Sequence, residues 1–246
     1  GCGSAYYAAM VGKYLLDGYL DMLITVELAS EYIYRKSYVP NDTMGVVVSQ
    51  SGETADTLKV LKLFKDQDIY TFGIVNAIGS SISREVNSGI YLHAGTEYSV
   101  ASTKAFTNQI IAILLLGCYL KQLSQPSASC FEQLSKIPTY IEYVFERELD
   151  IISVANKFKD HKNALYMGRG SMYPVAMEGA LKMKEISYIH AEGISASELK
   201  HGSIALIDDR FFIVYLLPTN DLYHKSLSNL EQVMARSSDS SILVIT

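Results

Sequence analysis

The sequence predicts an α/β protein made of two tandem copies of one unit, each a doubly wound and mostly parallel sheet flanked by helices, in a flavodoxin-like three-layer sandwich. Three observations support this prediction. Short β-rich runs alternate with amphipathic helical patterns, the chain matches itself at one offset, and its 246 residues are enough to bury two such cores.

The internal match lies at an offset of 167 residues. In this register, segment 1–12 is identical to segment 168–179 at Gly1, Gly3, Ser4, Tyr6, Ala9, Met10 and Gly12. The register holds without a gap, so the Ala-Ser-Glu of 29–31 falls on that of 196–198, and the strand-like run 45–49 falls on the apolar run 212–216. This agreement indicates a duplicated unit.

The local patterns place the elements of each copy. In the first copy they predict strands at 22–26, 44–49, 69–75 and 89–93, and helices at 4–19, 55–65 and 103–121. In the second copy they predict strands at 163–167, 211–217 and 241–246, and helices at 173–187 and 221–236. Helical periodicity between 127 and 159, interrupted by Pro138, predicts a connector. We therefore place a first subdomain at 1–125, a helical connector at 126–160 and a second subdomain at 161–246.

The repeat also indicates that this sequence is part of a longer one. The second copy has a strand before its Gly-x-Gly turn, whereas the first copy starts at that turn. The second copy ends inside the strand that corresponds to 69–75 of the first copy. In the first copy, a further strand and a long helix follow that strand. We therefore expect the second copy to be truncated at its C-terminus, and functional residues to lie outside the sequence.

Composition excludes several classes of function. The net charge of −5 leaves no basic face for nucleic acid, and the longest apolar run, 110–116 with 117–120 behind it, is shorter than the ~20 residues that span a bilayer. Cys2, Cys118 and Cys130 do not have the spacing of a metal site. We expect a cytoplasmic protein with a small-molecule ligand and without cofactor, metal, nucleic acid or membrane.

The first candidate site is a strand that runs into a Ser/Thr/Gly loop and then into a helix. The N–H groups and dipole of the first helical turn favour an anion, and Ser49, Ser51 and Thr54 add hydroxyl donors around Gly52. The loop has neither the lysine nor the spacing of a nucleotide P-loop. A single phosphate on a small molecule therefore fits better than a triphosphate. The alternative is an ordinary strand-to-helix turn with a serine cap.

The second candidate site is a charged stripe in the other copy. Glu178, Lys182 and Glu185 follow at spacings of four and three, which places them on one helix face. More ionisable residues come after them, at His190, Glu192, Glu198, Lys200 and His201. The alternative is a surface Glu–Lys pair worth only ~0.2–0.5 kcal/mol, but so many ionisable groups beside an apolar helix favour a site.

Four segments in order resemble the isomerase domain of glucosamine-6-phosphate synthase, the glutamine:fructose-6-phosphate amidotransferase family. They are 49–57 (SQSGETADT), 95–107 (GTEYSVASTKAFT), 177–192 (MEGALKMKEISYIHAE) and 198–202 (ELKHG). The resemblance covers essentially the whole chain. It implies two sugar isomerase (SIS) subdomains, in agreement with the duplication found independently.

The resemblance implies roles for individual residues. The phosphate of fructose 6-phosphate would bind Ser49, Gln50, Ser51 and Thr54, with Ser4 nearby and with Val100 and Ser102 at the sugar. The family usually has a serine where this chain has Ala5, so one hydroxyl is missing. A lost hydrogen bond to a charged group typically costs ~1.5–3 kcal/mol, which weakens substrate binding unless a neighbour compensates.

The resemblance also implies the catalytic residues. Glu185 matches the base that moves a proton between C1 and C2, which requires a carboxylate partly desolvated in a cleft. Lys182 would stabilise charge on the enolamine oxygen. His201 matches a histidine for ring opening that a neighbouring subunit contributes, which implies a homodimer, although taken alone it more often caps a helix C-terminus.

The family carries two parts that this sequence does not contain, a glutaminase domain and a C-terminal Schiff-base lysine. We therefore expect the chain to bind and isomerise sugar phosphate without making glucosamine 6-phosphate from glutamine unaided. Two other functions stay open. One is a stand-alone SIS-type isomerase, deaminase or deglycase for another phosphorylated sugar, and the other is a non-catalytic sugar-phosphate sensor, against which Glu185 and Lys182 argue.

Overall fold

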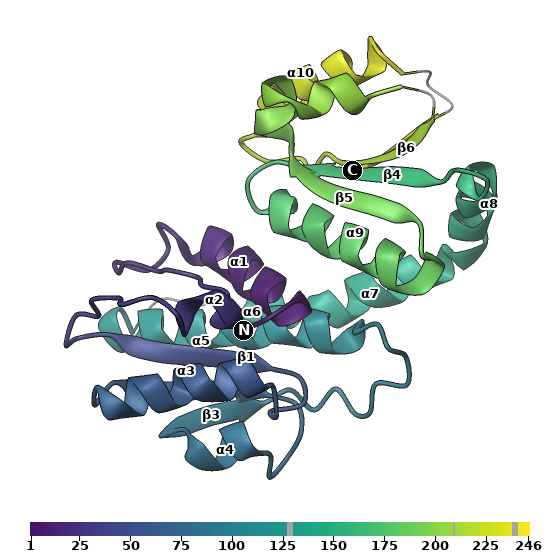
Figure 1. The fold of residues 1–246 in the computed structure, drawn as a ribbon. Coiled ribbons are helices and arrows are strands. Elements are labelled where there is room, and N and C mark those ends of the chain that lie inside the picture. The colour runs from purple at the N-terminus through teal and green to yellow at the C-terminus, as the bar shows by residue number, and fades with distance from the viewer. Residues whose placement is uncertain (127–129, 209, 238–240) are drawn as a thin grey trace. The chain divides into compact units, whose positions relative to one another are not determined.

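The computed structural model describes residues 1–126, 130–208, 210–237 and 241–246. The chain forms two compact units, Gly1–Ser127 and Ala128–Thr246, each with its own sheet (Figure 1). Within each sheet the described strands are all parallel. Helices flank both sheets, so the predicted α/β architecture of two parallel, helix-flanked units is confirmed.

The first unit has the sheet order β1-β2-β3. Its elements are α1 (Ser4–Leu16), α2 (Ala29–Tyr32), β1 (Met44–Ser49), α3 (Ala55–Asp66), β2 (Tyr70–Val75), α4 (Ser81–Glu85), β3 (Ser88–Tyr91) and α5 (Lys104–Ser124). Alternate strand residues point to opposite faces. Val48 and Ile74 therefore pack in one cluster with α1 and α5, whereas Val47 and Val75 pack in another with α3 and α4.

Glycines let α1 and α5 pack closely and in parallel. A Cβ on Gly12 would lie 2.4 Å from Ile113, and a Cβ on Gly117 would lie 2.3 Å from Leu16. By length and hydropathy alone α5 is a candidate membrane-spanning helix among the described residues. It contributes Ala112 and Ile113 to the core of the first unit, and 28% of its most apolar window is buried.

The second unit has the sheet order β5-β4-β6-β7. Its elements are α6 (Phe131–Leu134), α7 (Ile137–Glu146), α8 (Glu148–Phe158), β4 (Asn163–Gly168), α9 (Met172–Ser187), β5 (His190–Ser195), the 3₁₀ turns η1 (Ala196–His201) and η2 (Ser203–Leu206), β6 (Phe211–Leu216), α10 (Tyr223–Met234) and β7 (Ile242–Ile245). Leu165 and Ile213 share a cluster with Leu230 of α10, whereas Ala164 and Phe212 share one with Ala176 of α9.

The predicted connector is helical where it is described. Its residues 127–129 lie outside the described residues, and α6, α7 and α8 follow. The end of α8 packs within the second unit, because the Phe158 ring stacks on Phe212 with 4.1 Å between centroids. Most side chains of α7 and of α8 are exposed.

One predicted strand is wrong and one observed strand was missed. Residues 22–26 form no strand, whereas His190–Ser195 form β5, which the sequence analysis left unassigned. In the repeat register β5 falls on 23–28, so the two copies differ at the same place. In the second copy β5 bonds to β4, and residues 1–246 contain no first-copy counterpart of β4. Among the described residues, no strand pairs with 22–26.

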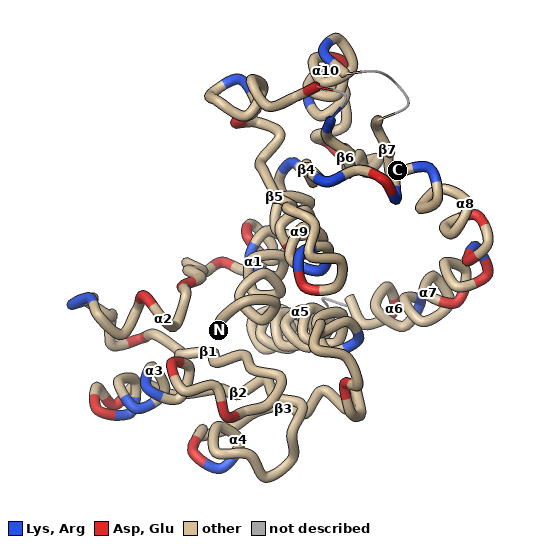
Figure 2. The backbone as a smooth tube through the Cα atoms, turned by 45° about the vertical axis from the view of Figure 1, so that its right-hand side comes forward, with Lys and Arg blue, Asp and Glu red and all other residues tan. Residues whose placement is uncertain are grey.

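Acidic and basic positions both occur in each unit. Basic and acidic positions interleave along the backbone, as on α3 with Asp56, Lys59, Lys62 and Lys65 (Figure 2). The described residues show no run of basic positions of the kind that binds a phosphodiester backbone.

Tyr215 of β6 predicts how the second unit responds to alkaline pH. Burial raises the pKa of Tyr215 from 10.0 to about 12, and its hydroxyl donates to the Ser226 carbonyl at 2.7 Å. Because the pKa is higher in the folded state than in the unfolded state, the protonated Tyr215 contributes its full stabilisation below pH 10. The folded state loses this contribution as the pH rises from 10 to 12, at about 1.4 kcal/mol per unit of pKa difference. The stability difference between wild type and Tyr215→Phe should therefore shrink from about pH 9 to about pH 11 in urea unfolding. A constant difference would contradict this.

Candidate functional site

A cavity of about 200 Å³ in the first unit collects most of the residues predicted to bind phosphate. Its walls include Ser4, Ser49, Gln50, Ser51, Thr54 and Ser102. Val100, which was predicted to close the sugar side, is 95% exposed and does not line the cavity. The cavity also exposes Gln109, which the sequence analysis did not select.

The loop after β1 is held by its own hydroxyl groups. The buried Ser49 Oγ accepts a hydrogen bond from the Gly52 N–H at 3.0 Å and lies 3.0 Å from the Thr54 Oγ1. The Ser51 Oγ accepts from the Glu53 N–H at 3.1 Å. Gly52 has φ +66°, and a Cβ there would lie 2.0 Å from the Ser80 Oγ. The loop conformation therefore requires glycine at this position.

These bonds limit what the loop can donate to a ligand. A hydroxyl has one proton, and Ser49 and Thr54 share one hydrogen bond, so one proton of the pair is already used. Ser51 acts only as an acceptor in its bond to Glu53 and keeps its proton. The loop thus retains two hydroxyl protons for an acceptor-rich group such as phosphate.

Two helix N-termini meet at the cavity. Ser4 is the first residue of α1 and Thr54 is the N-cap of α3, and both line the cavity. The partial positive charge and free N–H groups of such termini favour an anion. No lysine or arginine is among the described lining residues, so helix termini and hydroxyl groups are the anion-binding features that this lining offers.

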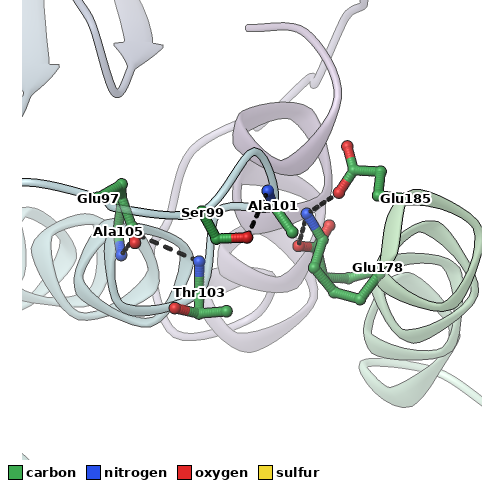
Figure 3. A network of polar contacts seen from close by, with 8 residues as sticks. Glu97, Ser99, Ala101, Thr103, Ala105, Glu178 and Glu185 are labelled. Carbon is green, nitrogen blue, oxygen red and sulfur yellow. Dashed lines mark hydrogen bonds and ion pairs between the residues drawn. The ribbon is translucent and has the colours of Figure 1, made fainter. Parts of the chain in front are cut away.

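The segment before α5 presents Ser102 to the cavity. Glu97 Oε1 accepts hydrogen bonds from the Thr103 N–H at 3.1 Å and the Ala105 N–H at 2.8 Å, and so caps α5. The Ser99 Oγ accepts from the Ala101 N–H at 3.2 Å. Figure 3 shows these contacts side by side. Sequence reasoning did not identify Glu97, because it lies seven residues before the first residue of α5 and reaches the helix N-terminus only through the fold of the loop between them.

The charged stripe of α9 forms a cluster in the second unit, with Glu178 and Glu185 visible in Figure 3. The Lys182 Nζ lies 2.5 Å from the Glu185 Oε2 and 3.3 Å from the Glu178 Oε1. The side chains of Glu178, Lys182 and Glu185 are 6%, 17% and 30% exposed, respectively. Glu185 is the most accessible member, and Lys182 fixes the orientation of its carboxylate.

Close packing keeps α9 in place beneath this cluster. A Cβ on Gly193 of β5 would lie 2.4 Å from the Met177 Cα, and a Cβ on Gly179 would lie 2.7 Å from the Tyr166 ring. Helix and sheet therefore approach backbone to backbone. A rigid element of this kind is what a catalytic side chain requires.

His201 is exposed at the end of η1, before Gly202, whose φ is +143°. Among the described contacts within the second unit, none joins His201 to Lys182 or Glu185. The cavity belongs to the first unit, and the Glu178–Lys182–Glu185 cluster belongs to the second.

Comparison with known proteins places this geometry in a family. The SIS domain model matches residues 1–118 and 157–246. The chain belongs to the SIS-domain family. The two matched segments fall in the two units, as expected for tandem SIS subdomains.

Curated relatives of this SIS chain are isomerizing glutamine–fructose-6-phosphate aminotransferases, and two of them illustrate the match to this chain. It is 45% identical over 239 residues to the isomerizing glutamine–fructose-6-phosphate aminotransferase of Chlorobaculum tepidum and 44% identical over 240 residues to that of Escherichia coli. Each match covers 96% of this chain and 39% of the relative. The SIS chain therefore spans about two fifths of the length of these relatives.

Solved structures show which part it matches. The C-terminal domain of the glucosamine-fructose-6-phosphate aminotransferase from Francisella tularensis is 37% identical, with a TM-score of 0.93 over 99% of this chain and 75% of that one. A glucosamine-6-phosphate deaminase from Thermotoga maritima, at 20% identity and TM-score 0.86 over 100% of this chain and 74% of that one, shares the fold. The SIS chain thus matches the isomerase portion of the aminotransferases.

Proposed function

We propose that this chain is the isomerase half of a glutamine–fructose-6-phosphate aminotransferase, and that it binds fructose 6-phosphate and moves a proton between C1 and C2. The observation that supports this most is a hydroxyl-lined cavity at two helix N-termini in a chain 37% identical to such an isomerase domain. When a glutaminase domain supplies ammonia, the product is glucosamine 6-phosphate. The same proposal holds that the protein works in the cytoplasm.

In this proposal the loop after β1 anchors the phosphate. Phosphate oxygens accept hydrogen bonds, which matches the free protons of Ser51 and of the Ser49–Thr54 pair. The backbone N–H groups at the start of α3 add donors. Gln50, Ser4 and Ser102 complete the contacts along the ligand.

Glu185 then performs the chemistry at the other end of the sugar. Its carboxylate takes a proton from C1 and returns it to C2, while the proton of the C1 hydroxyl moves to the oxygen or nitrogen on C2. The 2-keto sugar thus becomes an aldose and its C2 imine becomes a 2-amino aldose, without net gain or loss of protons. Lys182, 2.5 Å from Glu185, stabilises the oxygen that carries charge in the enolamine. In this scheme His201 opens the sugar ring from a neighbouring subunit of a homodimer.

Calorimetric titration of the purified chain tests the binding part of this proposal. We expect fructose 6-phosphate and glucosamine 6-phosphate to bind, and Ser51→Ala to weaken both by about 10- to 100-fold, because a lost bond to a charged group costs about 1.5–3 kcal/mol. Ser153→Ala, at an exposed position of helix α8 in the second unit, is the matched control. Binding of another sugar phosphate in place of these two would select a different SIS enzyme, and binding without hydrogen exchange at C1 or C2 would select a sensor.

A further inference from the structure

Gln109 is a buried polar side chain that the fold itself does not use. It lies in α5 with only 1% of its surface exposed, and it lines the cavity together with Ala5 and Ser102. Its Oε1 has no hydrogen-bond partner in the described part of the chain. A buried amide without a partner lowers stability relative to an apolar residue of the same shape. The fold gains nothing from this amide oxygen, which points to a role in ligand binding.

Helix packing explains why Gln109 faces the cavity. In the parallel α1–α5 pair, Ile113 meets Gly12 and Gly117 meets Leu16. Gln109 comes one turn before Ile113 and is therefore level with the first turns of α1. Ala5 lies in those turns and has no side chain long enough to reach across. The space in front of the amide is thus part of the cavity.

The chemistry of the amide separates it from the phosphate-binding hydroxyls. Phosphate oxygens accept hydrogen bonds, and so does the buried Gln109 Oε1, so these two groups do not pair. A sugar hydroxyl donates one hydrogen bond and accepts others, which complements an amide oxygen and its NH₂ group. The Ser102 Oγ lines the same cavity and is also buried without a described partner. The cavity therefore combines phosphate donors with a polar pair suited to a hydroxyl.

We propose that Gln109 binds a hydroxyl of the sugar whose phosphate the loop after β1 anchors, accepting its proton through Oε1 and setting the orientation of the sugar. This inference rests on the proposed function, because it requires a sugar phosphate in the cavity.

The test compares wild type with Gln109→Met, which keeps the length of the side chain and removes the amide. The affinities for fructose 6-phosphate and for inorganic phosphate are measured by calorimetry, and the melting temperature by circular dichroism. We expect the dissociation constant for fructose 6-phosphate to rise about tenfold or more, as for a lost bond in a desolvated site. The constant for inorganic phosphate should stay within about twofold, and the melting temperature should stay equal or rise, because no unpaired amide is left.

Gln122→Met is the matched control, since Gln122 lies on the exposed part of the same helix. It should change neither affinity. An unchanged affinity of Gln109→Met for fructose 6-phosphate, an equal loss for both ligands, or a variant that melts lower or does not fold would each overturn the inference. If wild type itself does not bind fructose 6-phosphate, the proposed function fails as well, so the two failures are distinguishable.

Discussion

Glu185→Gln is expected to lower hydrogen exchange at C1 and C2 of fructose 6-phosphate by about 10²- to 10⁴-fold, the usual contribution of a general base. Glutamine has the same shape as glutamate and its oxygen can still accept a hydrogen bond from Lys182, which lies 2.5 Å away in the wild type. It cannot take up a proton. The affinity for the sugar phosphate should therefore stay within about twofold, since the phosphate loop is untouched.

Proton NMR of the sugar in D₂O measures this exchange directly. Glu231→Gln is the matched control, because Glu231 is an exposed glutamate on α10 of the same unit. It should exchange at the wild-type rate. Equal exchange by wild type and Glu185→Gln would show that another group is the base.

Gly52→Ala is expected to remove phosphate binding and to destabilise the first unit by about 2–5 kcal/mol. The φ of +66° at Gly52 disfavours any residue with a Cβ by about 1–2 kcal/mol, and the added Cβ would lie 2.0 Å from the Ser80 Oγ and 2.5 Å from the Ser80 Cβ. Overpacking of this kind typically costs about 1–3 kcal/mol more. The resulting shift also breaks the Gly52–Ser49 hydrogen bond that shapes the loop.

The variant Gly79→Ala separates the cost of backbone strain from the cost of overpacking. Gly79 has φ +74°, but a Cβ there would meet nothing within 4 Å. This control should cost only the backbone strain, about 1–2 kcal/mol, and leave the affinity for fructose 6-phosphate unchanged. Urea unfolding gives the stabilities and calorimetry gives the affinities. If Gly52→Ala bound the ligand as tightly as Gly79→Ala, the loop would not be the phosphate anchor.

Sequence analysis located the strands whose own residues have a strand-like pattern, and it missed a strand that depends on its neighbours in the sheet. The run 44–49 is rich in β-branched apolar residues, and all six of its residues pair with β2, so β1 was placed at its observed limits. The sequence of β5, His-Ala-Glu-Gly-Ile-Ser, contains charge and glycine and does not resemble a strand. Its strand conformation comes from parallel pairing with β4 and from close contact with α9 through Gly193. Neither contact can be read from local pattern.

In the candidate site, too, sequence analysis could relate residues that are close in sequence but not residues that only the packing of the fold brings together. Ser49, Ser51 and Thr54 are neighbours in sequence, so one loop was enough to bring them together. Ser4, Ser102 and Gln109 reach the cavity only through the packing of α1, α5 and the segment before it. A signal for Gln109 was nevertheless present, because Ala105, Gln109 and Ala112 follow helical spacing on the buried face of α5. A glutamine in that stripe is a polar residue where the fold requires an apolar one.

The central claim is that one sugar phosphate is held at its phosphate end by the loop after β1 and is acted upon at its carbonyl end by Glu185. A crystal structure of the chain with fructose 6-phosphate bound tests this most directly. The account predicts phosphate oxygens within hydrogen-bond distance of the Ser51 hydroxyl and C1 and C2 within reach of the Glu185 carboxylate. Phosphate bound away from this loop, or C1 and C2 facing away from Glu185, would contradict it.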